Sequence, residues 1–291
     1  MPEVLALLVL AGCGGQAASP PPEPMTAQEQ EPPAAVQETV LPETEALEPL
    51  TAPAVVTEGR TPVEQYDLPV GRDYHANMMN WAGGNGESIA LLAEDSGADA
   101  AFYGVEWDTA LIRWGDSQAE FDWLFATPRQ YLPELYCFDL DGDWEDELVV
   151  LCYSGSGTGV SIYDLHVVEK DPDGTLTGYT LPRNVFSQLS ERISIFTSGG
   201  STYAILGTEL VDLTGFTENG ADIQGLALGD IVYYDVNPES AEGYDIRLLA
   251  GAWAESDYFP PTAAYMADLD ALVTYEDGVF TLSRIHLNGN D

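Results

Sequence analysis

The side chains with the clearest capacity for chemistry are the acids of one short stretch, from Phe138 to Val150. Between two apolar segments, acids stand at the first, third, fifth and ninth positions of a loop that starts at Asp139. A calcium ion takes six to eight oxygen ligands, and alternate residues of a tight loop can direct several carboxylates inward while a backbone carbonyl adds another. We therefore expect a calcium site whose ligands are the side chains of Asp139, Asp141, Asp143 and Glu147 and the carbonyl of Glu145.

The loop differs from an EF-hand and resembles another kind of calcium loop. An EF-hand needs glutamate at the twelfth position and helices on both sides, whereas this chain has Val150 there and strand-like flanks. Asp139 to Glu147 resembles the Asp-x-Asp-Gly-Asp-x-x-Asp-Glu loop of FG-GAP and VCBS repeats, which are β-flanked calcium loops. Those repeats usually carry glycine at the sixth position, where this chain has Trp144, for which a positive φ is costly. The alternative is a solvated acidic turn without an ion.

The N-terminus indicates export. An apolar run from Val4 to Leu10 precedes small residues and a cysteine, and it is far shorter than the roughly 20 residues that cross a bilayer. Leu10-Ala11-Gly12-Cys13 resembles the lipobox of bacterial lipoproteins. That resemblance implies that residues 1–12 are a signal peptide and that Cys13 becomes the mature N-terminus and carries the acyl chains, such as palmitate. The mature protein is then expected at the cell membrane, anchored by lipid, with its domain facing outside the cytoplasm.

The segment after Cys13 is predicted to be a disordered tether. Residues 16–64 include 10 Pro, 9 Glu, 8 Ala, 6 Thr and 4 Gln and no aromatic residue. Such a composition buries too little apolar surface to offset the entropy of the chain. The first aromatic residue is Tyr66. We therefore assign residues 13–64 to the lipidated cysteine and its tether, and residues 65–291 to a globular domain.

The charge of the chain limits its partners. With 9 Lys+Arg against 49 Asp+Glu, the net charge is −40. Nucleic acids are excluded as partners, because phosphate binding depends on clustered cations. Anionic lipid headgroups are excluded as direct partners by the same repulsion. Contact with the membrane is expected only through the lipid.

The two cysteines beside the acidic loop allow two interpretations. Cys137 and Cys152 flank the loop on opposite predicted strands. In an exported protein they can form a disulfide that closes the hairpin and adds roughly 3 kcal/mol of stability. The alternative is two reduced cysteines in adjacent strands. A zinc site has little support, because His75, His166 and His286 are far apart and no Cys-x-x-Cys is present.

Short apolar runs separated by Gly, Asp, Asn and Ser predict a mainly β domain with antiparallel sheets, hairpins and a minor helix. Hairpin turns are predicted at residues 171–174, 199–200 and 276–278, and one helix at Val185 to Arg192 with Asn184 as its N-cap. The alternatives are a small β-propeller and an α+β fold. Strands are expected at residues 89–94, 100–105, 110–115, 135–138, 148–153, 161–169, 193–196, 202–207, 230–236, 245–249, 267–275 and 279–286.

No residue set specifies a reaction, so we assign no catalytic residue. There is no Gly-x-Ser-x-Gly elbow, and Gly155 to Gly159 lacks the Lys-Ser/Thr of a phosphate loop. We expect a binding or interaction module whose partner is an extracellular protein or a glycan. The alternative is a cell-envelope hydrolase that acts on carbohydrate through a pair of carboxylates, which the many acids of the domain neither nominate nor exclude.

Overall fold

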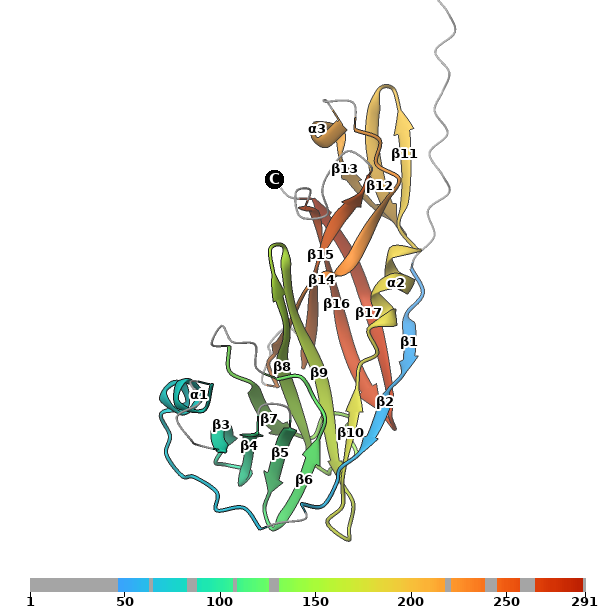
Figure 1. The fold of residues 1–291 in the computed structure, drawn as a ribbon. Coiled ribbons are helices and arrows are strands. Elements are labelled where there is room, and N and C mark those ends of the chain that lie inside the picture. The colour runs from blue at the N-terminus through green and yellow to red at the C-terminus, as the bar shows by residue number, and fades with distance from the viewer. Residues whose placement is uncertain are drawn as a thin grey trace, which may run out of the picture. The chain divides into compact units, whose positions relative to one another are not determined.

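A computed structural model describes residues 47–62, 65–82, 88–106, 109–125, 131–217, 221–238, 245–256 and 265–289. The predicted signal peptide, Cys13 and most of the predicted tether lie outside these residues. The prediction of a mainly β fold with antiparallel sheets and little helix is confirmed (Figure 1). Within the described residues, no helix combines the length and the apolar character needed to cross a membrane.

The elements follow one another as a series of strands interrupted by three short helices. In chain order they are β1 (Leu50–Pro53), β2 (Val55–Glu58), α1 (Tyr74–Ala82), β3 (Ile89–Asp95), β4 (Ala100–Val105), β5 (Thr109–Trp114), β6 (Ser117–Phe121), β7 (Glu134–Phe138), β8 (Glu147–Gly157), β9 (Val160–Lys170), β10 (Leu176–Thr180), α2 (Asn184–Ser190), β11 (Ser194–Ser198), β12 (Ser201–Leu206), β13 (Glu209–Asp212), α3 (Thr214–Thr217), β14 (Gly225–Val236), β15 (Ile246–Glu255), β16 (Tyr265–Glu276) and β17 (Val279–Gly289).

The strands form one large sheet and two small ones. The ten-stranded sheet runs in the order β1-β17-β16-β15-β14-β9-β10-β2, and β8 pairs with β9 and with β7. All of its pairings are antiparallel except the short parallel contact between β9 and β14. The small sheets are β3-β4-β5-β6 and β11-β12-β13. A propeller requires repeated four-stranded blades around a channel, so the propeller alternative is wrong.

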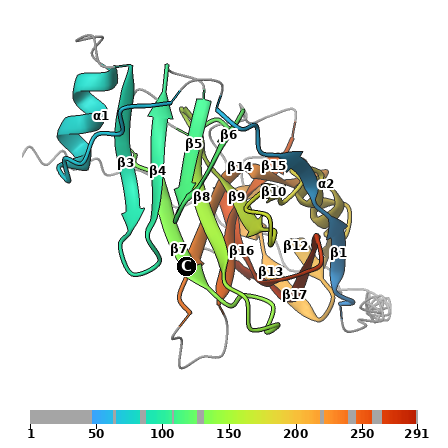
Figure 2. The ribbon, with the colours of Figure 1, turned by 90° about the horizontal axis from the view of Figure 1, so that it is seen from below.

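After Glu147, strand β8 is apolar from Leu148 to Tyr153 because both of its faces are buried. Val149 and Leu151 lie in the core that β8 shares with β14 to β17 and α2. Leu148, Val150 and Cys152 lie in a second core, against the β3-β4-β5-β6 sheet, which Figure 2 shows beside β7, β8 and β9. A strand buried on both faces reads as a continuous apolar run. This strand is also the one that ends the acidic loop.

The predicted domain boundary at Glu64 is wrong, because residues 50–58 belong to the large sheet. Strand β1 pairs with β17, with Leu50 opposite Leu282, and β2 pairs with β10. Leu50 and Ala52 are buried in the main core. The composition of the segment did not indicate these strands. A strand that adds to the edge of an existing sheet gains its hydrogen bonds from that sheet, so a few alternate apolar residues are enough to bury one of its faces. Pro53 is tolerated because it stands at the end of an edge strand.

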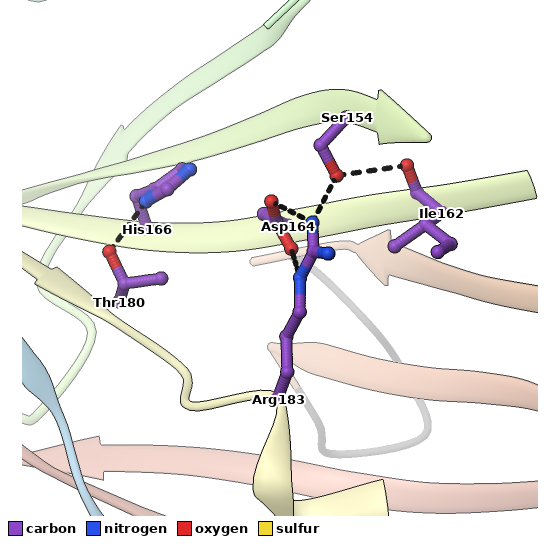
Figure 3. A network of polar contacts seen from close by, with 6 residues as sticks. All are labelled: Ser154, Ile162, Asp164, His166, Thr180 and Arg183. Carbon is purple, nitrogen blue, oxygen red and sulfur yellow. Dashed lines mark hydrogen bonds and ion pairs between the residues drawn. The ribbon is translucent and has the colours of Figure 1, made fainter. Parts of the chain in front are cut away.

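Every predicted strand has a counterpart, and all three predicted hairpin turns are confirmed. Strands β1, β2, β6, β10 and β13 and helices α1 and α3 were not predicted. The predicted helix begins one residue early, at Asn184, so Asn184 is not its N-cap. Arg183 occupies the N-cap position without a side-chain cap, because a guanidinium has no acceptor for a backbone N–H. It instead donates to Asp164 at 2.7 and 2.9 Å and to Ser154 at 2.9 Å (Figure 3).

Candidate metal centre

Two paired strands hold the ends of the acidic loop. Phe138, the last residue of β7, lies opposite Glu147, the first residue of β8. The predicted β flanks are therefore present, and the loop consists of residues 139–146. Because Glu147 belongs to a strand that is buried on both faces, the strand and not the loop sets its position.

Side-chain carboxylates organise the loop by accepting its own backbone N–H groups. Asp139 accepts the N–H of Gly142 at 2.7 Å through Oδ1 and the N–H of Trp144 at 3.1 Å through Oδ2. Asp141 accepts the N–H of Asp143 at 3.1 Å, and Asp143 accepts the N–H of Glu145 at 2.8 Å. Such turns are typical of aspartate and fix short loops without regular structure. The alternate acids therefore shape the loop as well as furnishing oxygen atoms.

Trp144 has a positive φ, a backbone conformation that glycine adopts most readily. The φ of Trp144 is 77°, and the residue is 94% exposed. A positive φ is costly for a bulky residue, and here the hydrogen bond from its N–H to Asp139 helps to offset that cost. The indole extends into solvent, so its bulk meets no resistance from the protein. The tryptophan at the sixth position therefore does not prevent the loop geometry.

Three of the predicted ligands come together. Asp139, Asp141 and Glu147 each present a carboxylate oxygen, and these atoms lie within 4.8 Å of one another. Calcium–oxygen distances are 2.3–2.6 Å, so two ligands of one ion lie at most about 5 Å apart. The oxygens therefore fit around a single calcium ion, and an all-oxygen set suits a hard cation. No nitrogen or sulfur ligand belongs to this group.

The other two predicted ligands lie beside this group. Asp143 and Glu145 are not part of the three-carboxylate cluster, although both line the hollow next to it. Asp143 uses Oδ1 to accept the Glu145 N–H. The sequence pattern therefore predicted the place of the loop between two strands but treated its acids as equivalent, whereas the fold separates them by burial.

Glu147 has the most unusual environment among these acids. Glu147 is 5% exposed, and its Oε2 accepts the N–H of Leu140 at 2.8 Å. The pKa of Glu147 is raised to about 7, chiefly by burial and also by the nearby carboxylates Asp141, Asp143 and Asp139, against the effect of the Leu140 hydrogen bond. Burial likewise raises the pKa of Asp141, with Asp143 and Asp139 also contributing. A cation at this point would relieve the repulsion directly.

A hollow of about 440 Å³ adjoins the loop and is lined mainly by acids. Its walls include Glu169 and Asp171 from the β9–β10 hairpin and Asp277 from the β16–β17 turn. Both turns were predicted from the sequence. Their proximity to the loop was not predicted, because they lie far from it along the chain. Lys170 also lines the hollow, and its Nζ lies 4.7 Å from the centroid of the Trp114 ring.

Of the two interpretations of Cys137 and Cys152, the disulfide is wrong, and the structure has two free cysteines in adjacent strands. Cys137 lies opposite Leu148, and Cys152 stands four residues further along β8. Four residues of strand span about 13 Å, well beyond the reach of a disulfide. The prediction that the two cysteines lie on opposite strands is correct, but the register of these strands keeps the two residues apart. Burial raises the pKa of Cys137 to about 12, which makes it a poor metal ligand.

The histidines and tryptophans do not form another site within the described residues. His75 and His286 are exposed, whereas His166 is buried in the core, stacked on Trp123. Trp114, Trp123 and Trp253 are buried, as expected for core residues. Trp107 and the side chain of Trp81 lie outside the described residues.

Comparisons of the chain with family models, with curated proteins and with solved structures gave no match. The functional interpretation therefore depends on the chemistry of the loop and of its surroundings.

Proposed function

We propose that this protein is a lipid-anchored surface lipoprotein whose β domain is a binding module stabilised by calcium at the Asp139 to Glu147 loop. The observation that carries the calcium assignment is the convergence of Asp139, Asp141 and Glu147 oxygens within 4.8 Å. One of these acids is buried, and such a carboxylate is costly without a partner of opposite charge. Asp143 and the carbonyl of Glu145 are the candidates for the remaining coordination positions.

The role we propose for the ion is structural. Bound calcium would offset two of the negative charges of the loop and join the end of β7 to the start of β8, the pair closed by Phe138 and Glu147. A site of this kind suits a location outside the cytoplasm, where calcium modules bind the ion with dissociation constants of about 10⁻⁴ to 10⁻³ M. Attachment through Cys13 would place the domain there.

A specific observation favours a second candidate, the carbohydrate hydrolase. The hollow beside the loop contains several carboxylates and one tryptophan, Trp114, and glycosidases use two carboxylates about 5 to 10 Å apart. We rank this candidate second because the ammonium of Lys170 lies over the Trp114 ring. A sugar that stacked on the same ring would have to displace that cation.

The deciding experiment is thermal unfolding of the mature chain in EDTA, in millimolar calcium and in millimolar magnesium. We expect a rise in Tm that is specific to calcium, because a ligand of the folded state stabilises it by mass action. Asp141→Ala should abolish the rise, whereas Glu191→Ala, which removes an exposed acid at the end of α2 that does not line the hollow, should retain it. Equal shifts with both metals, or a full calcium response in Asp141→Ala, would refute the site.

The anchor and the hydrolase have separate tests. Metabolic labelling with a palmitate analogue should modify the wild-type chain and leave Cys13→Ser unlabelled and released from the membrane. Release of reducing sugars from cell-wall polysaccharide by the wild type, and its loss with Tm retained in Asp171→Asn, a change at an exposed acid that lines the hollow, would favour the hydrolase over the binding module.

A further inference from the structure

Four tyrosines from separate segments form a continuous cluster at the surface, which we name the tyrosine patch: Tyr131, Tyr153, Tyr163 and Tyr233. Tyr131 precedes β7, and the others belong to β8, β9 and β14, which are labelled in Figure 1. Ring centroids are 4.5 Å apart for Tyr131 and Tyr153, 5.0 Å for Tyr153 and Tyr163, and 5.6 Å for Tyr163 and Tyr233. The patch therefore joins elements that are distant in sequence.

The two residues at the ends of the tyrosine patch are exposed to solvent, whereas a residue at its centre is buried. Tyr131 is 50% exposed and Tyr233 is 41% exposed, whereas Tyr153 is buried. The Tyr233 hydroxyl donates to Ser161 Oγ at 2.8 Å or accepts from it, which fixes the ring. Rigid, partly exposed tyrosines lose little entropy on binding and are enriched at interfaces.

The patch continues into a hollow of about 400 Å³ on β14 to β17. Tyr233 belongs to both, and Ile231, Leu249 and Tyr265 form apolar parts of the lining. Gly251 makes room for the Tyr265 ring, because a Cβ there would lie 2.5 Å from Tyr265 Cε2. An apolar floor beside exposed aromatic rings is the usual anatomy of a binding surface.

Negative charge surrounds this surface. Glu134 lies close enough to Tyr163 and Tyr136 to raise the pKa of both hydroxyls, after the larger effect of burial. Asp268 and Asp270 line the hollow. The one cation among the residues that line it, Arg247, forms an ion pair with Asp270 at 3.4 Å. Any ligand here therefore meets a negative field and the electron-rich faces of tyrosine rings.

We propose that the tyrosine patch and its adjoining hollow dock an extended, lysine- and arginine-rich segment of a partner protein. This inference rests on the proposed function, and it names the partner class of the binding module. Cations placed over tyrosine rings gain cation–π attraction, carboxylates at the edge attract the same charges, and apolar side chains between the cations fill the hollow. A second copy of this chain is disfavoured, because each copy has a net charge of −40.

The test measures binding of a labelled decalysine peptide to the full chain in 150 mM salt by fluorescence anisotropy. Loss of both exposed rings, in Tyr131→Leu/Tyr233→Leu, should weaken binding roughly tenfold, since each exposed cation–π contact is worth about 0.5–1 kcal/mol. Tyr131→Phe, which keeps the ring, should retain the affinity. Tyr203→Leu is the matched control, because it removes an aromatic residue of the β11-β12-β13 sheet at unchanged net charge.

A charge pair separates a local effect from the attraction of the whole acidic chain. Glu134→Gln and Glu58→Gln each remove one exposed carboxylate, the first beside the patch and the second on β2. The Glu134 variant should lose more affinity than the Glu58 variant. Equal losses in these variants, or unchanged affinity in the double leucine variant, would overturn the inference.

The result can be read independently of the calcium site. Binding of a neutral cello-oligosaccharide in place of decalysine would overturn the inference in favour of a glycan partner. A calcium-specific rise in Tm in a chain that does not bind decalysine would overturn this inference alone, and the calcium loop would stand. Loss of the calcium response with decalysine binding intact would refute the metal site and support the docking surface.

Discussion

The imidazole of His166 lies against the indole of Trp123, with ring centroids 4.1 Å apart and 15° between the ring planes. Both rings are buried between the large sheet and the β3-β4-β5-β6 sheet. His166 Nδ1 lies 2.7 Å from Thr180 Oγ1 (Figure 3), whereas His166 Nε2 and Trp123 Nε1 have no hydrogen-bond partner among the described residues. The contact therefore accommodates a neutral histidine and disfavours a charged one.

We expect stability to fall in mild acid because of His166. Burial lowers its pKa to about 4 from 6.5, so between these values the unfolded chain binds a proton that the folded chain does not. The associated stability is present above pH 6.5 and is lost as the pH falls to 4, by about 3 kcal/mol. Urea unfolding at several pH values should show the free-energy gap between wild type and His166→Gln narrowing by this amount. A gap independent of pH would contradict the assignment.

Glu147→Gln should stabilise the protein in EDTA at pH 8 while removing its response to calcium. The pKa of about 7 in the folded chain lies above the ordinary 4.5, so ionisation costs the folded state stability as the pH rises through this range. A neutral amide avoids that cost, with an expected gain of about 3 kcal/mol in the free energy of unfolding. Urea titrations with and without calcium measure both effects. Glu145→Gln, at an exposed loop position, is the control and should give little gain.

Gly178→Ala should destabilise the junction of the two sheets. An added Cβ would lie 2.6 Å from Cζ2 of Trp123 and 3.0 Å from Phe121. Overpacking of this kind typically costs about 1–3 kcal/mol, which a urea titration would detect. Gly157→Ala is the matched control in a strand, because its nearest neighbour would be Val160 Cβ at 3.5 Å, an ordinary contact. Equal effects of the two substitutions would show that the Trp123 contact is unimportant.

A fragment that begins at residue 65 should be less stable than one that begins at residue 47. The shorter fragment lacks β1 and β2, and with them the buried Leu50 and Ala52 and two strand pairings. We expect a loss of about 3 kcal/mol or more from the apolar burial and the hydrogen bonds. Comparison of their urea midpoints tests this. Equal urea midpoints for the two fragments would support the domain boundary at Glu64 that composition predicted.

The β character and the acidic loop could be read from the sequence because both are local patterns. The apolar run Leu148 to Tyr153 and the Gly-containing turns identify strands and hairpins without knowledge of their partners. The alternate aspartates of the loop fold it through bonds between near neighbours, such as Asp139 with Gly142. Strands β1 and β2 escaped prediction because the sheet edges that hold them come from β17 and β10.

By itself, the sequence determined the strand content, the position of the loop and the excess of negative charge, since each depends on residue type and short spacing. Only the tertiary structure decided which carboxylates meet, because Glu147 is placed by a doubly buried strand and Asp277 by a turn more than a hundred residues away. Strand register likewise separated Cys137 from Cys152, and strand pairing assembled the tyrosine patch. Register and sheet order are long-range properties, set by the packing of two cores that no local pattern encodes.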